Sequence, residues 1–138
     1  MRSDIIVNRE RASQLLAFDG LEWGKCKCTD IDVSLDFQGK TFVFVEMKGK
    51  GAQLTLGQKL HLQALVKGLR AGGRTAFAVI GHHDTPSTDD DVHVAEAKVW
   101  SVYAGGRGWY KPEAGTTVKQ FIDTIHEEHT SGLYQTAP

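Results

Sequence analysis

Two neighbouring segments near the middle of the chain constrain its fold more than any other feature. Residues 29–37 (TDIDVSLDF) alternate polar and apolar side chains, and residues 41–48 (TFVFVEMK) are rich in β-branched and aromatic residues. Both patterns are typical of β-strands, and they are separated by Gln38, Gly39 and Lys40. We therefore predict a β-hairpin whose strands span residues 29–37 and 41–48.

The register of this hairpin decides which side chains share a face. If the loop holds three residues, counting outward places Asp32 opposite Glu46. The same count places Asp30 opposite Lys48, and all four polar side chains then share one face because residues two apart on a strand point the same way. The apolar residues expected together on the other face are Ile31, Val33, Leu35, Val43, Val45 and Met47. A two-residue loop would separate Asp32 from Glu46.

The remaining pattern predicts an alternation of helices and strands. The expected elements are a helix from Asn8 to about Phe18, a helix from after Thr55 to about Arg70, a strand at 74–81, one or two strands at 92–110 around a glycine-rich turn, and a helix capped by Thr117. The order αββαβ, followed by β and α, predicts an α/β fold in which helices flank one central mixed sheet. We expect residues 1–138 to form a single domain.

Glu46 and Lys48 are the residues of this hairpin that indicate a chemical function. Carboxylates crowded on a buried sheet face repel one another and are costly to desolvate, unless a cation lies between them. Oxygen ligands without a nearby histidine favour Mg²⁺ or Mn²⁺ over zinc, and such an ion can bind a phosphate and lower the pKa of an attacking water. Lys48 would orient or deprotonate that water, or neutralise charge on the phosphorane. The pattern therefore indicates metal-dependent hydrolysis of phosphodiester bonds.

The sequence TDID, followed after one hairpin by VEMK, resembles the PD-(D/E)XK nuclease superfamily, especially its small phage, prophage and Holliday-junction-resolvase-like members. The resemblance covers residues from about 8 to 81 and implies a restriction-endonuclease-like αββαβ core. It implies that Asp32 and Glu46 bind the metal and that Lys48 activates water. The proline of the family motif is absent, so Asp30 remains an alternative or additional ligand, although the hairpin pairing favours Asp32.

Four further residues are candidates for supporting roles. Gln58 stands where some members of the superfamily carry a glutamine on the helix after the second strand, but it also fits a capping box with Thr55. Glu10 matches an additional metal-binding glutamate of certain members, although the helix dipole favours a carboxylate there regardless of function. Lys50 and Lys59 belong to a basic cluster that would bind a nucleic-acid backbone.

The overall charge limits the kind of nucleic-acid binding that we expect. The chain has 16 Lys and Arg against 17 Asp and Glu, a net charge of −1, which disfavours tight, indiscriminate binding. Binding of DNA must then rely on a local groove, on a homodimer, or on recognition of branched or single-stranded structure. No window has the roughly 18 apolar residues of a membrane span, and we expect a cytoplasmic protein of a bacterial or phage-infected cell.

Two cysteines and three aromatic residues are assigned no site. Cys26 and Cys28 are expected to be reduced, and their spacing is not that of a zinc finger. Trp100, Trp109 and Tyr110 could stack on unpaired bases, but aromatic residues on a late hairpin are more often packing residues. The rival functional hypothesis is a catalytically inactive nuclease fold that binds nucleic acid or a host protein.

Overall fold

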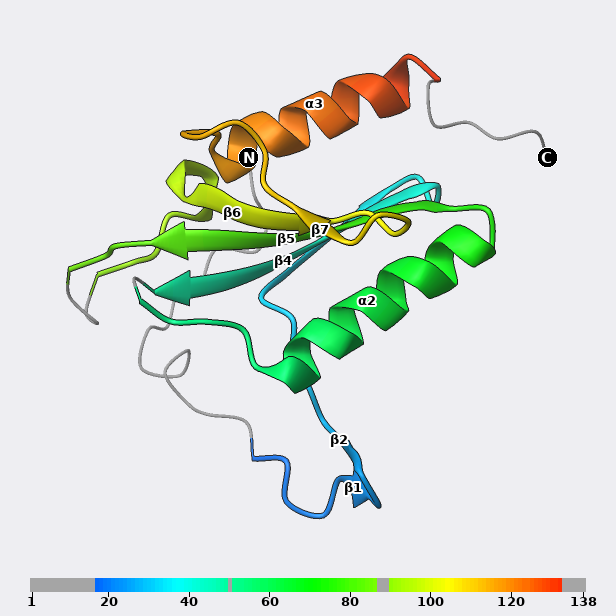
Figure 1. Ribbon diagram of the computed structural model, residues 1–138, viewed down its shortest axis with the longest axis vertical. Coiled ribbons are helices and arrows are strands. Elements are labelled where there is room, and N and C mark those ends of the chain that lie inside the picture. The colour runs from blue at the N-terminus through cyan, green and yellow to red at the C-terminus, as the bar shows by residue number, and fades with distance from the viewer. Residues whose placement is uncertain (1–16, 50, 87–89, 133–138) are drawn as a thin grey trace.

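One open mixed sheet of five strands carries the fold. The computed structural model describes residues 17–49, 51–86 and 90–132 (Figure 1). The strands, in their order across the sheet, are β3 (Val33–Phe37), β4 (Thr41–Gly49), β5 (Thr75–His83), β6 (Lys98–Tyr103) and β7 (Trp109–Tyr110). Strands β4 and β5 are parallel, and the other neighbours are antiparallel.

Two helices cover opposite faces of this sheet. Helix α2 (Leu56–Ala71) follows β4 on one side, and helix α3 (Val118–Thr130) lies on the other side (Figure 1). A short 3₁₀ helix, η1 (Val94–Glu96), precedes β6, and strands β1 (Glu22–Trp23) and β2 (Cys26–Lys27) pair as a separate small ribbon. The predicted α/β fold with a central mixed sheet is confirmed.

Each face of the sheet has its own hydrophobic core because strand side chains alternate between the two faces. The buried core under α3 comprises Val43, Val45, Phe77, Val79, Ala97, Val102, Val118 and Ile125. The buried core under α2 comprises Phe44, Leu62, Val66, Ala76, Ala78, Ile80 and Tyr103. Glu46 follows Phe44 by two residues on β4, so its carboxylate is on the α2 face of the sheet.

The hairpin register is the one predicted for a three-residue loop. Phe37 pairs with Thr41 and Val33 with Val45, with Gln38 to Lys40 between the strands. Gln38 and Gly39 both have positive φ, 58° and 69°, as a tight hairpin turn requires. The two-residue alternative is therefore wrong.

The first predicted strand is shorter than expected, and this moves one side chain to the other face. The strand was predicted from Thr29, but pairing begins at Val33. Ile31 consequently packs against the α2-side core instead of lying beside Val33 on the α3 side, which corrects the predicted face. Asp30 and Asp32 stand in this unpaired lead-in, where aspartate, a poor strand former, interrupts the ladder.

The helix boundaries follow from side-chain caps. Thr55 and Thr117 each cap a helix, and in each case the glutamine three residues later completes a capping box. Both predicted caps are confirmed. The helix predicted from Asn8 lies almost wholly outside the described residues, and its expected last residue, Phe18, is not helical.

Candidate active site

The candidate site is built around Glu46, near the carboxyl end of β4. Its side chain is buried, with 6% of the residue exposed, and Ile80 is its neighbour on the parallel strand β5. Ligands of α/β sheets bind at the carboxyl ends of parallel strands, and Glu46 lies three residues before that end of β4. The same strand end also presents Lys48, two residues further along the face.

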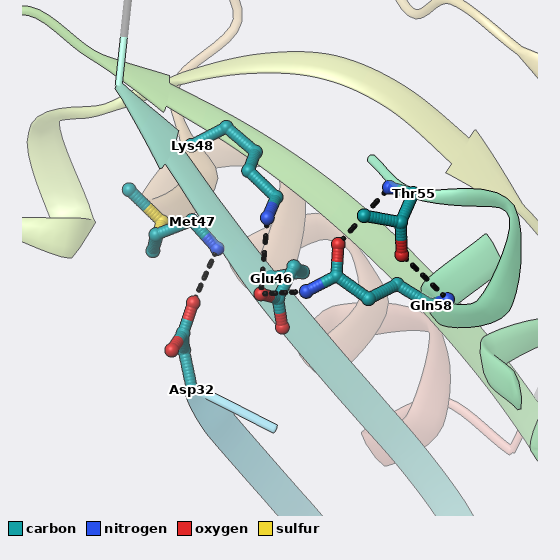
Figure 2. A network of polar contacts seen from close by, with 6 residues as sticks. All are labelled: Asp32, Glu46, Met47, Lys48, Thr55 and Gln58. Atoms are coloured by element: carbon teal, nitrogen blue, oxygen red, sulfur yellow. Dashed lines mark hydrogen bonds and ion pairs between the residues drawn. The ribbon is translucent and has the colours of Figure 1, made fainter. Parts of the chain in front are cut away.

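Asp32 contacts β4 through a hydrogen bond of its side chain, and not through backbone pairing between strands. Its Oδ2 accepts a hydrogen bond of 2.7 Å from the backbone N–H of Met47, between Glu46 and Lys48 (Figure 2). A strand continued in the same register would have placed Ile31 opposite Met47. The aspartate carboxylate therefore takes a backbone donor of β4 where β3 has not yet begun, and it is fixed beside Glu46 by that bond.

Lys48 and Gln58 contact the same carboxylate oxygen from two directions. Lys48 Nζ lies 3.8 Å from Glu46 Oε1, and Gln58 Nε2 donates to the same oxygen at 3.4 Å (Figure 2). Gln58 also accepts from the Thr55 backbone N–H through Oε1. The two interpretations of Gln58, capping residue and site residue, are thus both realised by one side chain, because its oxygen caps α2 while its nitrogen reaches Glu46.

The surroundings of Glu46 favour the neutral form of its carboxyl group. The pKa of Glu46 is raised from 4.5 to about 7, chiefly by burial and then by the negative charges of Asp32 and Asp30. Lys48 and a hydrogen bond from the Asp32 backbone act in the opposite direction but do not cancel the increase. Near neutral pH the isolated site therefore holds Glu46 in both protonation states, and an added cation would favour the ionised one.

The residues present fit a hard divalent ion that is held by few protein ligands. Among residues 17–49, 51–86 and 90–132, no three His, Cys, Asp or Glu side chains gather closely enough to hold a metal ion. Mg²⁺ is nevertheless commonly bound through one or two carboxylates, with waters and substrate phosphates completing its shell. Asp32 and Glu46 supply such a pair, and the raised pKa of Glu46 marks where positive charge is missing.

The other predicted site residues divide into three groups. Asp30 is exposed and influences Glu46 through its charge. Lys59 is on α2 next to Gln58, and its ammonium lies 5.9 Å from the centre of the Trp109 ring. Glu10 and Lys50 lie outside the described residues.

A cavity of about 440 Å³ adjoins the site on the same face of the sheet. Its lining residues are Gly51, Ala52, Gln53, Leu54, Lys59, Ile80, His82, Trp100, Ser101 and Trp109. Sequence reasoning assigned Trp100 and Trp109 no site. The available signal was two tryptophans on adjacent predicted strands, with lysines nearby, but their common location depends on long-range packing.

Comparisons with known proteins found no relative of this chain. Neither family models, curated proteins nor solved structures gave a match to the chain. None of the helices in the described part of the chain has the length and apolar content needed to cross a membrane.

Proposed function

We propose that this protein is a Mg²⁺- or Mn²⁺-dependent nuclease that hydrolyses phosphodiester bonds of DNA, with Asp32, Glu46 and Lys48 in its active site. The observation that carries the proposal is the buried Glu46 carboxylate, with Asp32 beside it and Lys48 3.8 Å away, at the carboxyl end of a strand. This is the arrangement that the resemblance to the PD-(D/E)XK superfamily implies, and the restriction-endonuclease-like fold is part of the proposal.

Different groups hold the two carboxylates in position. The Met47 N–H holds Asp32 by one oxygen, so the orientation of its carboxylate is set by the main chain of β4. Glu46 is oriented by Lys48 and by the amide of Gln58. A divalent ion bound by Asp32 and Glu46 would supply Lewis-acid activation of the phosphate and a lower pKa for the attacking water.

Lys48 is the side chain placed to act on the nucleophile. Its ammonium is on the same face as Glu46, where it can orient the attacking water and neutralise charge that develops on the phosphate. In the hydrolysis, the water oxygen forms a bond to phosphorus while the bond from phosphorus to the leaving oxygen breaks. The water loses a proton to solvent, and the leaving oxygen gains one from solvent.

Gln58 is proposed as a positioning residue because it contacts Glu46 and no reacting atom. Its place in the capping box fixes its side chain to the first turn of α2, and this links the helix to the carboxylate. A substitution at this position should therefore change the site through the orientation of Glu46.

The proposal is tested by cleavage of end-labelled single-stranded, duplex, flapped and four-way DNA, and of RNA, with Mg²⁺, Mn²⁺ or EDTA. We expect cleavage of at least one DNA substrate that needs metal, stops with EDTA and returns when metal is restored. Size-exclusion chromatography with light scattering, run with and without the cleaved DNA, tests whether the protein forms a homodimer. Binding without cleavage of any substrate would support the rival hypothesis of an inactive nuclease fold.

A further inference from the structure

The cavity beside the candidate active site has walls suited to a flat, polar aromatic ligand. Leu54 and Ile80 provide apolar surface, Trp100 and Trp109 provide aromatic rings, and Lys59 provides positive charge. None of the residues that line the cavity, all of them in the described part of the chain, is acidic. The site therefore combines apolar and aromatic walls with a cation, as expected for a ligand that is flat and carries negative charge nearby.

Two side chains contact the Trp100 ring at one side of this cavity. The His82 imidazole is parallel to its indole, with ring centres 4.7 Å apart and an interplanar angle of 7°. Lys111 Nζ lies 3.7 Å from the centre of the same ring. Half of Trp100 is exposed to solvent.

Trp109 forms a second aromatic wall and carries a donor without an acceptor. It packs against Tyr103 with ring centres 5.4 Å apart, and the ammonium of Lys59 lies above it. Its Nε1 is the one buried side-chain nitrogen or oxygen in residues 17–49, 51–86 and 90–132 that has no hydrogen-bond partner. Buried donors are normally paired, so this one is an unsatisfied donor on a residue that lines the cavity.

The cavity is close enough to Glu46 to receive part of the same substrate. Glu46 is the register partner of Ile80 on β5, and Ile80 is the partner of Ser101 on β6. Adjacent strands are about 4.8 Å apart, so these two lining residues are roughly 5 and 10 Å from Glu46 across the sheet. A phosphate held at Glu46 would therefore have its neighbouring base within reach of the cavity.

We propose that this cavity binds an unpaired nucleobase adjacent to the scissile phosphate, so that the substrate is single-stranded or frayed nucleic acid. The inference rests on the proposed nuclease function. A base inside a duplex is stacked on its neighbours and paired along its edge, whereas an unpaired base has a free face for Trp100 and a free edge for Gln53 and Ser101.

The binding requires Lys111 to leave the ring that it covers. The contact of an exposed lysine with such a ring changes an equilibrium constant by roughly 2- to 5-fold. Stacking of a base on an aromatic side chain strengthens binding by roughly 5- to 150-fold. The base therefore displaces the ammonium, and Lys111 is then free to contact a neighbouring phosphate. His82, which also lines the cavity, remains stacked on Trp100 and keeps the indole in its orientation.

The test measures affinity by fluorescence anisotropy with labelled single-stranded DNA, single-stranded RNA and duplex DNA of one sequence. Full-length protein carrying Lys48→Ala is used with Mg²⁺ to prevent cleavage, alone and combined with Trp100→Ala, Trp100→Phe or Trp23→Ala. Trp23 is the matched control because it is 66% exposed on β1 and does not line the cavity. Circular dichroism verifies that each variant is folded.

We expect Trp100→Ala to weaken single-strand binding by roughly 5- to 150-fold, Trp100→Phe to restore most of it, and Trp23→Ala to change neither substrate. Duplex affinity should be the same in all variants. The DNA and RNA arms identify which nucleic acid supplies the base, and a selective loss on either supports the proposal. An abasic nucleotide beside the binding position should reproduce the Trp100→Ala loss.

Two results would overturn the inference: no saturable binding of either single strand, or an equal effect of Trp100→Ala on single strands and duplex. Failure of the nuclease function is seen separately, as absence of metal-dependent cleavage by protein with Lys48 intact. A nuclease that cleaves single-stranded nucleic acid normally after Trp100→Ala would retain the proposed function and refute the base-binding cavity.

Discussion

Replacement of Glu46 by glutamine should make the metal-free protein more stable at alkaline pH while removing its activity. Glutamine has nearly the same shape as glutamate and still offers an oxygen to Lys48 and Gln58, but it cannot ionise. The wild-type carboxylate is buried beside Asp32, and burial followed by this neighbouring charge opposes its ionisation. The substitution therefore removes an unfavourable charge from the folded state.

The magnitude follows from the pKa of Glu46 in the folded and unfolded chain. A value of 4.5 in the unfolded chain and about 7 in the folded chain means that the folded state binds the proton more tightly. Stability contributed by the neutral carboxyl is complete below pH 4.5 and is lost as the pH rises through 7. The loss amounts to about 3 kcal/mol at most. Glu46→Gln should not lose this stability, so its melting temperature should be roughly 10 °C higher than that of wild type at pH 8.

The assay is urea unfolding at pH 5 and pH 8 in EDTA, comparing wild type with Glu46→Gln. Glu113→Gln is the matched control, because Glu113 is exposed and distant in sequence from the site. The difference in unfolding free energy between wild type and Glu46→Gln should be small at pH 5 and approach 3 kcal/mol at pH 8. Mg²⁺ should then stabilise wild type at pH 8 and leave Glu46→Gln unchanged.

The reasoning is refuted if Glu46→Gln and wild type unfold at the same urea concentration at pH 8, or if wild type gains stability relative to the variant between pH 5 and pH 8. Either result would mean that Glu46 ionises without cost in the folded protein. The carboxylate would then not mark a place where a cation is missing.

Five further substitutions, grouped in three predictions, test the residues around this carboxylate. Asp32→Asn should reduce metal-dependent cleavage by more than about 100-fold and Asp30→Asn by only a few-fold, measured as initial rates; equal effects would contradict the preference for Asp32. Thr55→Ala and Gln58→Ala should each lower the unfolding free energy by about 1 kcal/mol, but only Gln58→Ala should slow cleavage. If both variants cleave more slowly, Gln58 acts only as a capping residue of α2. Leu62→Ala should lower the unfolding free energy by about 2–5 kcal/mol in urea, and a smaller cost would question the α2-side core.

The hairpin and the helix caps could be predicted because their causes are local. Gly39 in the loop permits a tight turn, and alternating apolar residues on both strands allow only one register that buries them together. Thr55 followed by Gln58 identifies the start of α2 by the same kind of short-range chemistry. These features placed Glu46 and Lys48 on one face before any tertiary contact was known.

The lead-in to β3 could not be predicted because its regular alternation conceals competition between side chain and backbone. Asp32 provides an oxygen for the Met47 N–H, so the strand need not continue to Thr29. The aspartate still reaches Glu46, but by a side-chain bond instead of sheet pairing. Ile31 is then free to turn toward the α2-side core.

The aromatic cavity was missed for a different reason. Trp100 lies where the β5–β6 register shifts between Ile80 and Gly81, and a bulge changes the side-chain direction that simple alternation would assign. Its stacking partner His82 is on another strand, and Lys111 comes from beyond β7. Such contacts depend on long-range pairing, for which the residue pattern carries little information.

The most direct test of the central claim is single-turnover cleavage of labelled DNA by wild type, Lys48→Ala and Lys119→Ala with Mn²⁺ or EDTA. Lys119 is the control lysine, since it is exposed and pairs with Asp123 on α3. We predict metal-dependent cleavage by wild type and Lys119→Ala, with a loss of about 10²- to 10⁴-fold in Lys48→Ala. Cleavage that persists in EDTA, or that is equally fast in Lys48→Ala, would contradict the assignment of this site.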